Sequence, residues 1–255
     1  MNDLTVLVPP SRETLQQRVY GELRMALMRG EFTPGRSLTI RALASALRTS
    51  SMPVREALRQ LVTERALEML ANRSFGVPRL SRERYQDILR ARVEVEGFAA
   101  SEAATRIGKP QLDRLRDVNL EMRAASDRGD RLRFISCNQE FHFTVYRAAE
   151  SNTLIPLIET LWLQAGPYVG CLYSDGLDPV VNLGHHEGLI TALRRKDPAK
   201  SRAMLVADIT TPAARVIELA MARYSEDEPS APRVRRGAAG KRSQLAHALA
   251  SYRDA

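Results

Sequence analysis

The sequence predicts a mainly α-helical protein built from two domains. Apolar residues recur at helical spacing over most of the 255 residues, whereas the alternation of a β-hairpin is found over residues 67–77. After Pro78 the apolar stripes lengthen, which indicates a second domain of longer helices. The chain is long enough for two modest cores. We assign a flexible N-terminus to residues 1–10, a first domain to 11–79, a second domain to 80–225 and a disordered basic tail to 226–255.

Three helices and a hairpin are predicted in the first domain. The first helix runs from Leu15 to Leu27 with an apolar residue at every fourth position, and Gly30 follows as its C-terminal cap glycine. After a Pro-Gly turn, residues 39–47 form a short helix, and a tight connection leads to another helix over residues 50–61. The hairpin has a polar tip, Asn72-Arg73-Ser74. This order of elements is that of a winged helix-turn-helix.

The second domain is predicted to be an all-helical bundle. Ser81 caps its first helix, and Asp197-Pro198 is a start signal for its last helix, in which Pro212 is expected to introduce a kink. Glycine, aspartate and proline residues between Gly166 and Leu183 predict a break followed by a loop. The expected helices span residues 81–107, 110–127, 130–150, 153–173, 184–196 and 198–224.

Positive charge is concentrated in the first domain. The whole chain has a net charge of +8, and residues 11–80 contain 12 Arg, no Lys, 6 Glu and no Asp. A compact basic segment favours a polyanionic partner such as nucleic acid. An arginine-rich, solvated surface is the alternative, because the whole chain prefers arginine to lysine.

The remaining composition indicates a cytoplasmic protein. Cys137 and Cys171 are the two cysteines and are not in a CxxC pair, so a disulfide framework or a thiolate metal site is not expected. No stretch approaches the roughly 20 apolar residues of a membrane span. The first ten residues lack the basic and apolar regions of a secretory signal.

The start of the helix at residues 50–61 is suited to reading DNA. The second helix of a helix-turn-helix enters the major groove by its N-terminal residues, where backbone N–H groups and the helix dipole favour phosphate. Ser50 is expected to be the N-cap, and Ser51 and Met52 lie at the tip. Arg55 emerges one turn later, within reach of a phosphate or of guanine O6 and N7. An ordinary capped surface helix is the alternative.

Two further places in the first domain are predicted to contact DNA. Arg41, on the outward face of the short helix, is expected to reach the DNA backbone or a base edge. Asn72, Arg73 and Ser74 form the tip of the wing and are expected to lie in the adjacent minor groove.

The stretch GEFTPGRSLTIRALASALRTSSMPVREALRQLVTERALE, followed by NRSFGVP, resembles the DNA-binding domain of GntR-type bacterial transcription regulators. The resemblance covers about residues 11–79, and its P-V-R-E-A-L core is intact. It implies that Arg41 and Arg55 contact DNA, with Ser50, Ser51 and Met52 at the tip of the reading helix.

This sequence departs from the family pattern at three places. Arg48-Thr49 stands where the family has Gly-Val, and Arg65 stands at the glycine of the usual E-G-L. Relatives often carry arginine at the position of Ser51, which is short. The operator is therefore expected to differ from theirs at that contact.

Polar side chains of metal-binding types occur on several helices of the second domain. Asn138 and His142 are four residues apart and share one helix face. His186 precedes an apolar helix, and Asp208 lies among core-like residues in the middle of another helix. Arg92 is on the first long helix and is expected to point inward. These ligand types permit a divalent metal site, and hydrogen-bonded or exposed histidines are the alternative.

Residues 80–225 resemble the all-helical, ligand-sensing FCD-type domain of the FadR subfamily. The matching patterns are R-x-x-x-E-G from Arg92, N-x-x-F-H from Asn138, and H-x-x-[IL]-x-x-A-L-x-x-x-D from His186. In many such domains one Asp and three His bind Zn²⁺, Ni²⁺ or a similar ion beside a small carboxylate effector. Here Asn138 stands at the Asp position and Asp208 at the last His position.

The resemblance implies a metal site formed by Asn138, His142, His186 and Asp208, with His185 as a substitute ligand. It also implies that Arg92 pairs with the effector carboxylate, because a guanidinium binds a carboxylate in a bidentate manner.

The leading hypothesis is a homodimeric, ligand-responsive transcription regulator, most often a repressor in this family, that binds a palindromic operator in double-stranded DNA. A hydrolytic enzyme with a metal centre at His142, His186 and Asp208 is an alternative, although no general base or nucleophile has a recognisable spacing. A non-specific architectural protein is a third alternative, and the sensor-sized helical domain disfavours it.

Overall fold

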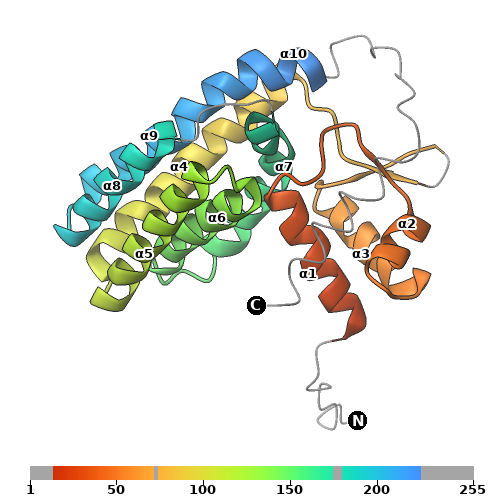
Figure 1. The fold of residues 1–255 in the computed structure, drawn as a ribbon, viewed down its shortest axis with the longest axis horizontal. Helices are drawn as coiled ribbons and strands as arrows, with labels where there is room; N and C mark the ends of the chain where they lie inside the picture. The colour runs from red at the N-terminus through yellow and green to blue at the C-terminus, as the bar shows by residue number, and fades with distance from the viewer. Residues whose placement is uncertain (1–13, 72–73, 175–179, 225–255) are drawn as a thin grey trace, which may run out of the picture.

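The computed structural model describes residues 14–71, 74–174 and 180–224. It is mainly helical with one small sheet (Figure 1), which confirms the predicted fold class. The predicted flexible start at residues 1–10, the predicted basic tail at 226–255, and two wing residues, Asn72 and Arg73, lie outside the described residues.

The first domain is a winged helix-turn-helix. It contains α1 (Leu15–Met28), β1 (Ser37–Leu38), α2 (Ile40–Ala46), α3 (Ser51–Thr63), β2 (Glu68–Met69) and β3 (Phe75–Gly76). β3 is the central strand and pairs antiparallel with both β1 and β2. The sequence predicted the hairpin of β2 and β3 but missed β1, because a two-residue strand carries no alternation to detect.

Apolar residues of α1 and α3 form the centre of the first domain. Val54, Leu58 and Leu61 of α3 are completely buried, as their spacing predicted. Leu15 is an exception to the predicted stripe of α1, since it is 51% exposed. It lies in the first turn of the helix, and the buried positions begin one turn later at Val19.

Helices α1, α2 and α3 end in the same type of left-handed turn. Gly30 (φ 65°), Arg48 (φ 51°) and Arg65 (φ 58°) each lie two residues beyond the last helical residue. The N–H of each donates to the carbonyl three residues back, and the next N–H donates to the carbonyl five residues back. This is the Schellman motif, which usually has glycine at the left-handed position. The prediction that Gly30 caps α1 is confirmed, while Arg48 and Arg65 stand where the family pattern has glycine.

Arg48→Gly and Arg65→Gly are each expected to raise the free energy of unfolding by about 0.5–1 kcal/mol. A left-handed conformation costs a side-chain-bearing residue about 1–2 kcal/mol, and the greater freedom of glycine in the unfolded chain offsets part of the gain. Urea unfolding measures the change. As a control, Arg18→Gly in the exposed face of α1 is expected to destabilise by about 1 kcal/mol. A loss of stability in Arg48→Gly like that of Arg18→Gly would contradict the prediction.

The second domain is a bundle of long helices. Its elements are α4 (Arg82–Arg106), α5 (Lys109–Asp127), α6 (Arg131–Arg147), α7 (Leu154–Ser174), α8 (Val180–Arg194), α9 (Pro198–Arg215), a π-helix (Val216–Ala220) and α10 (Met221–Tyr224). The predicted caps are confirmed: Ser81 Oγ accepts from the Arg84 N–H, and Asp197 Oδ1 accepts from the Lys200 N–H. None of the described helices combines the length and apolar character that a membrane span needs.

Pro212 lies inside α9, where the sequence predicted a kink. It has no N–H to donate to the carbonyl of Asp208, four residues earlier. The helix changes to the π form from Val216 onward. The irregular helix geometry therefore begins eight residues after Asp208. Single π-type turns are often found near functional sites.

The helix predicted over residues 153–173 is found as α7, which continues through Gly166, Pro167 and Gly170 to Ser174. The break and loop predicted between Gly166 and Leu183 therefore do not begin at the glycines, and residues 175–179 lie outside the described residues. The two glycines instead permit close contact with the end of α1. A Cβ atom on Gly166 would lie 2.4 Å from the carbonyl oxygen of Leu27, and one on Gly170 would lie 2.4 Å from that of Gly30. Glycine spacing in a sequence does not distinguish a helix break from such a backbone contact.

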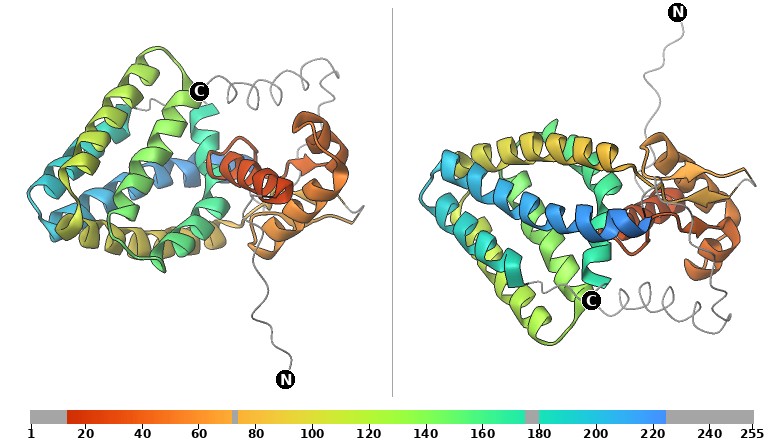
Figure 2. Two further views of the ribbon diagram at one scale, coloured as in Figure 1. Left: turned by 90° about the horizontal axis from the view of Figure 1, so that it is seen from below. Right: turned by 90° about the horizontal axis from the view of Figure 1, so that it is seen from above.

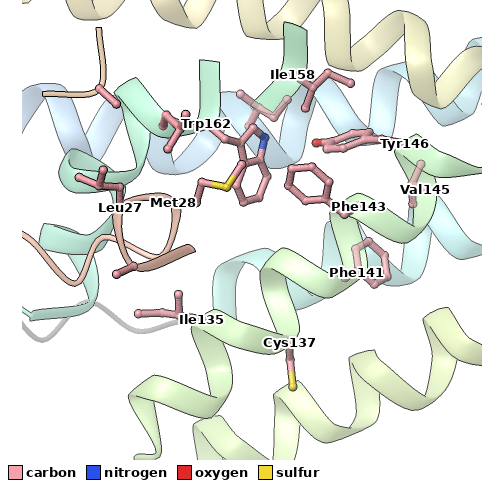
Figure 3. Close-up of a cluster of buried hydrophobic side chains, with 14 of the residues drawn as sticks. Leu27, Met28, Ile135, Cys137, Phe141, Phe143, Val145, Tyr146, Ile158 and Trp162 are labelled. Carbon is pink, nitrogen blue, oxygen red and sulfur yellow. The ribbon is translucent and has the colours of Figure 1, made fainter. Parts of the chain in front are cut away.

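Helix α1 lies between the remainder of the first domain and the helical bundle, as the views in Figures 1 and 2 agree. The buried apolar core is continuous across this boundary. Leu27 and Met28 at the end of α1 share a cluster with Ile158 and Trp162 of α7 (Figure 3). The two domains therefore pack on each other through α1 and α7.

Candidate functional site

The N-terminal end of α3 presents the predicted DNA-reading residues to solvent. Ser51, Met52 and Arg55 are exposed, Met52 to 67%. Ser50 occupies the N-cap position, but its hydroxyl accepts no hydrogen bond from the helix, so the expected capping bond is absent. The first-turn N–H groups of α3 are thus not occupied by the Ser50 side chain, and a helix start of this kind is suited to bind an anion.

Arg41 lies on the exposed face of α2. The N-terminus of α2 differs from that of α3, because Thr39 Oγ1 accepts a capping bond from the Ala42 N–H at 3.3 Å. In the wing, the Leu70 N–H donates to the carbonyl oxygen of Ser74 at 2.9 Å, which closes the hairpin. Ser74 is half-buried. The other two predicted wing-tip residues, Asn72 and Arg73, lie outside the described residues.

Buried side chains from α6, α8 and α9 converge in the second domain. His142, His186 and Asp208 are 3%, 0% and 3% exposed. Nε2 of His142 lies 3.0 Å from Oδ2 of Asp208, and Nε2 of His186 lies 3.4 Å from Oδ1. One ligand atom of each residue lies within 4.8 Å of the others. Two imidazoles and a carboxylate are a donor set that Zn²⁺ and similar metals accept, with coordination positions left open.

Tyr146 orients the ring of His142. Burial and the nearby charge of Glu96 raise the pKa of Tyr146 well above its usual value, so the phenol keeps its proton and donates a hydrogen bond to Glu96. Its oxygen lies 3.1 Å from Nδ1 of His142, and because it has no second proton, Nδ1–H is the donor. Nε2 then faces Oδ2 of Asp208, and either a proton or a metal ion between these two atoms satisfies both. A hydrogen-bonded second nitrogen is usual for metal-binding histidine.

His186 is positioned by stacking. Its ring lies on that of Phe141, with centroids 3.9 Å apart and planes 13° apart. Within the described part of the chain, neither ring nitrogen of His186 has a hydrogen-bond partner. Burial lowers the pKa of His186, so its ring is neutral at neutral pH.

Asp208 remains ionised although it is buried. Burial acts to raise the pKa of Asp208, but the interactions with His186 and His142 outweigh it and hold that pKa well below its usual range. An ionised carboxylate beside a neutral imidazole is the protonation state in which these groups bind a metal.

Asn138 and His185 differ in their relation to this cluster. Asn138 lies one turn before His142 and lines the same cavity, and its Oδ1 has no hydrogen-bond partner among the described residues. An amide oxygen is a weaker ligand for soft metals than imidazole or carboxylate. His185 lies apart from the cluster, with Nε2 3.3 Å from the Thr211 hydroxyl.

Arg92 belongs to a buried polar network. Its Nε and Nη2 donate to Oε1 and Oε2 of Glu96 at 2.7 and 3.4 Å, and its guanidinium lies 5.3 Å from the centre of the Trp162 ring. Glu96 is wholly buried and also accepts from Trp162 Nε1 at 3.0 Å and from Tyr146. Burial acts to lower the pKa of Arg92, but Glu96 outweighs it and the pKa is raised. Glu96 is the glutamate of the R-x-x-x-E-G pattern, a signal that could have identified it from sequence.

A cavity of about 50 Å³ opens beside these residues. It is larger than the roughly 10–15 Å³ that one water needs, so it admits a small polar ligand. Its wall includes Arg92, Asn138, His142 and Asp208 from the second domain, together with Met28 and Arg29 from the end of α1. The sequence pointed to the first four residues but contained no signal for the last two.

Both domains match known families. Residues 15–77 match the family described as bacterial regulatory proteins, gntR family, and residues 87–211 match the FCD domain. The HTH-type transcriptional regulator McbR of Escherichia coli (strain K12) is 31% identical over 187 residues, which cover 72% of this chain and 84% of McbR. The chain belongs to the GntR family.

Further GntR-family proteins agree with this assignment. The HTH-type transcriptional repressor GlaR of Escherichia coli (strain K12) is 27% identical over 211 residues, covering 80% of this chain and 96% of GlaR. The solved structure of E. coli McbR/YncC has a TM-score of 0.77 at 28% identity, and the match covers 81% of this chain and 99% of that one. The predicted resemblance is confirmed.

Membership of the GntR family decides between the classes of function. These relatives are transcription regulators and not enzymes, so this chain is a DNA-binding transcription regulator. The alternative of a metal-dependent hydrolase at His142, His186 and Asp208 receives no support from them.

Proposed function

We propose that this GntR-family regulator is a homodimeric repressor whose operator affinity is controlled by a small carboxylate effector bound in the FCD domain. One observation carries the proposal: Arg92, His142 and Asp208 line the same small cavity. A guanidinium and a metal site beside each other form a receptor for an acid, because both bind carboxylate oxygens.

The proposed metal is Zn²⁺ or Ni²⁺, with His142, His186 and Asp208 as ligands and Asn138 as a fourth donor. The fit is supported by buried atoms without a hydrogen-bond partner in the described residues: both ring nitrogens of His186, Oδ1 of Asp208 and Oδ1 of Asn138. When bound, the metal supplies a Lewis acid for an oxygen of the effector. The contact of Nδ1 with the Tyr146 hydroxyl directs Nε2 of His142 at Asp208.

Arg92 is proposed to bind the effector carboxylate. Its raised pKa keeps it charged, and Glu96 holds the guanidinium in one orientation through Nε and Nη2. A guanidinium has five N–H donors, so these two bonds leave donors for a ligand in the cavity.

The proposed DNA contacts are made by α2, α3 and the wing. Two copies of α3 are expected to read half-sites of a palindrome about one helical turn apart. The support is the net positive charge of residues 11–80, the exposure of Arg41 and Arg55, and the absence of a side-chain cap at the start of α3. The remaining proposed contacts are Ser50, Ser51, Met52, Asn72, Arg73 and Ser74.

The test of the function is selection of bound genomic fragments by the full-length protein. The expected result is that the bound fragments share a short palindrome. The affinity of the protein for this palindrome is expected to change when Zn²⁺ or Ni²⁺ is added together with acetate, lactate, succinate or citrate. Equal affinity for all DNA sequences would contradict a regulator that reads an operator, and an operator affinity indifferent to every acid would contradict the effector.

Arg55→Ala is expected to weaken operator binding by roughly 1–3 kcal/mol. If Arg55 reads a base, the substitution relaxes specificity at one base pair. If Arg55 binds a phosphate, the affinity for all DNA sequences falls by the same factor. Titration of operator variants at fixed salt separates these cases. Arg90→Ala is the matched control, since Arg90 is an exposed arginine of α4 in the other domain. Unchanged affinity in Arg55→Ala would remove this residue from the interface.

A further inference from the structure

The effector cavity in the FCD domain is completed by the DNA-binding domain. Met28 and Arg29, at the C-terminal end of α1, form part of the same wall as Arg92, His142 and Asp208. Figure 3 shows Met28 next to Trp162, whose ring also lines the cavity. A ligand in the cavity therefore meets side chains of both domains.

Arg29 is held at this wall by a polar contact with α6. Its Nε donates to Oε1 of Gln139 at 3.1 Å, and the Gln139 amide nitrogen in turn lies 3.5 Å from Sδ of Met28. Gln139 is buried and lines the cavity as well. The cavity thus has two arginines in its wall, Arg92 from the sensor domain and Arg29 from the DNA-binding domain, and the guanidinium of Arg29 contacts Gln139, another wall residue.

The end of α1 rests directly on the backbone of α7. The glycines Gly30, Gly166 and Gly170 allow this contact, since a Cβ on any of them would approach backbone atoms within 2.4–2.5 Å. One turn away, Arg24 donates to Glu159 of α7 at 2.9 Å. Movement of α1 relative to α7 would therefore displace Arg29 from the cavity.

The recognition helix α3 is tied to α1. The Tyr20 hydroxyl donates to Oε1 of Glu64, directly after α3, and Arg24 Nε lies 3.9 Å from Oε2 of the same carboxylate. The two helices also share the apolar core of the first domain. If α1 moves relative to α7, α3 and its DNA-reading end are therefore expected to move with α1.

We propose that Arg29 is an effector-binding residue, so that a small carboxylate in the cavity is bound jointly by Arg92 of the FCD domain and Arg29 of the DNA-binding domain. This rests on the proposed effector function. Bound acid favours the arrangement in which α1 is docked on α7, because only that arrangement provides the second guanidinium. By reciprocity, DNA that binds a different domain arrangement lowers the affinity of the protein for the acid.

The test compares full-length Arg29→Gln with Arg18→Gln, which removes the same charge from an exposed position of the same helix. Zn²⁺ alone, and then acetate, lactate, succinate and citrate on the Zn²⁺-loaded protein, are titrated by calorimetry. For each acid that binds the wild type, we expect Arg29→Gln to lower the binding affinity by tenfold or more and to leave the Zn²⁺ affinity unchanged. Arg18→Gln should match the wild type, and Arg29→Lys should bind the acids with intermediate affinity.

Three results would overturn the inference. If the wild type and Arg29→Gln bind an acid equally, Arg29 is not an effector residue, and the proposed function stands. If Arg29→Gln loses Zn²⁺ affinity and melting temperature together with the acids, its role is structural. If the wild type binds none of the four acids, the proposed effector site itself fails, and the inference fails with it.

Discussion

Glu96→Ala is expected to lower the free energy of unfolding by about 3–5 kcal/mol, the usual cost of breaking a buried ion pair by removing one partner. Glu96 is completely buried and accepts hydrogen bonds from Arg92, Tyr146 and Trp162. Its removal leaves a buried guanidinium without a counter-charge and two further donors without an acceptor. Urea unfolding followed by fluorescence is suitable, since Trp162 is the single tryptophan and touches Glu96.

Glu102→Ala is the matched control for this experiment. Glu102 is on the same helix and also pairs with an arginine four residues later, Arg106, at 2.6 Å. That pair is partly exposed, so its loss is expected to cost only about 0.3–0.5 kcal/mol. Equal effects of the two substitutions would mean that the Arg92–Glu96 network does not stabilise the FCD domain.

Asp208→Asn is expected to lower Zn²⁺ or Ni²⁺ affinity by about 100-fold or more, because changes to groups that merely orient metal ligands already cost roughly 10–100-fold. Asparagine keeps the volume of Asp208 but removes the negative charge between His142 and His186. Calorimetric titration and the metal content of the dialysed protein measure the loss. The variant should keep its helical circular dichroism, since the residue size is unchanged.

Asp113→Asn is the control for metal binding. Asp113 is an exposed carboxylate of α5 that pairs with Lys109, away from the cavity. It should bind metal as the wild type does. Wild-type metal affinity in Asp208→Asn would exclude the cluster of His142, His186 and Asp208 as the metal site.

Much of the fold was predictable because its signals are local. Apolar spacing determines which face of a helix is buried, so the inward position of Leu58 and Leu61 followed from sequence. Gly30 was recognisable as a cap because the left-handed turn it forms favours glycine over other residues. Strand β1 and the contact of Gly166 and Gly170 with the end of α1 were not predictable, because their causes lie in distant parts of the chain.

The candidate site was predictable in part. His142, His186 and Asp208 stood out as polar groups at helix positions, and the family resemblance grouped them before the structure placed them together. Tyr146 was not singled out, since a tyrosine four residues after a histidine has no distinctive pattern. Its role follows from Glu96, which lies 50 residues earlier in the chain and accepts the hydrogen bond of the tyrosine hydroxyl.

The sequence by itself determined the family, the winged helix-turn-helix, the helical sensor domain and most of the polar groups of its cavity. Only the tertiary structure decided that the end of α1 closes this cavity, with Arg29 in its wall and Gly30 against Gly170. The physical reason is that periodicity and turn chemistry are encoded within a few neighbouring residues. A contact between residues about 140 positions apart depends on how whole helices pack, and local spacing does not specify the partner of a buried face.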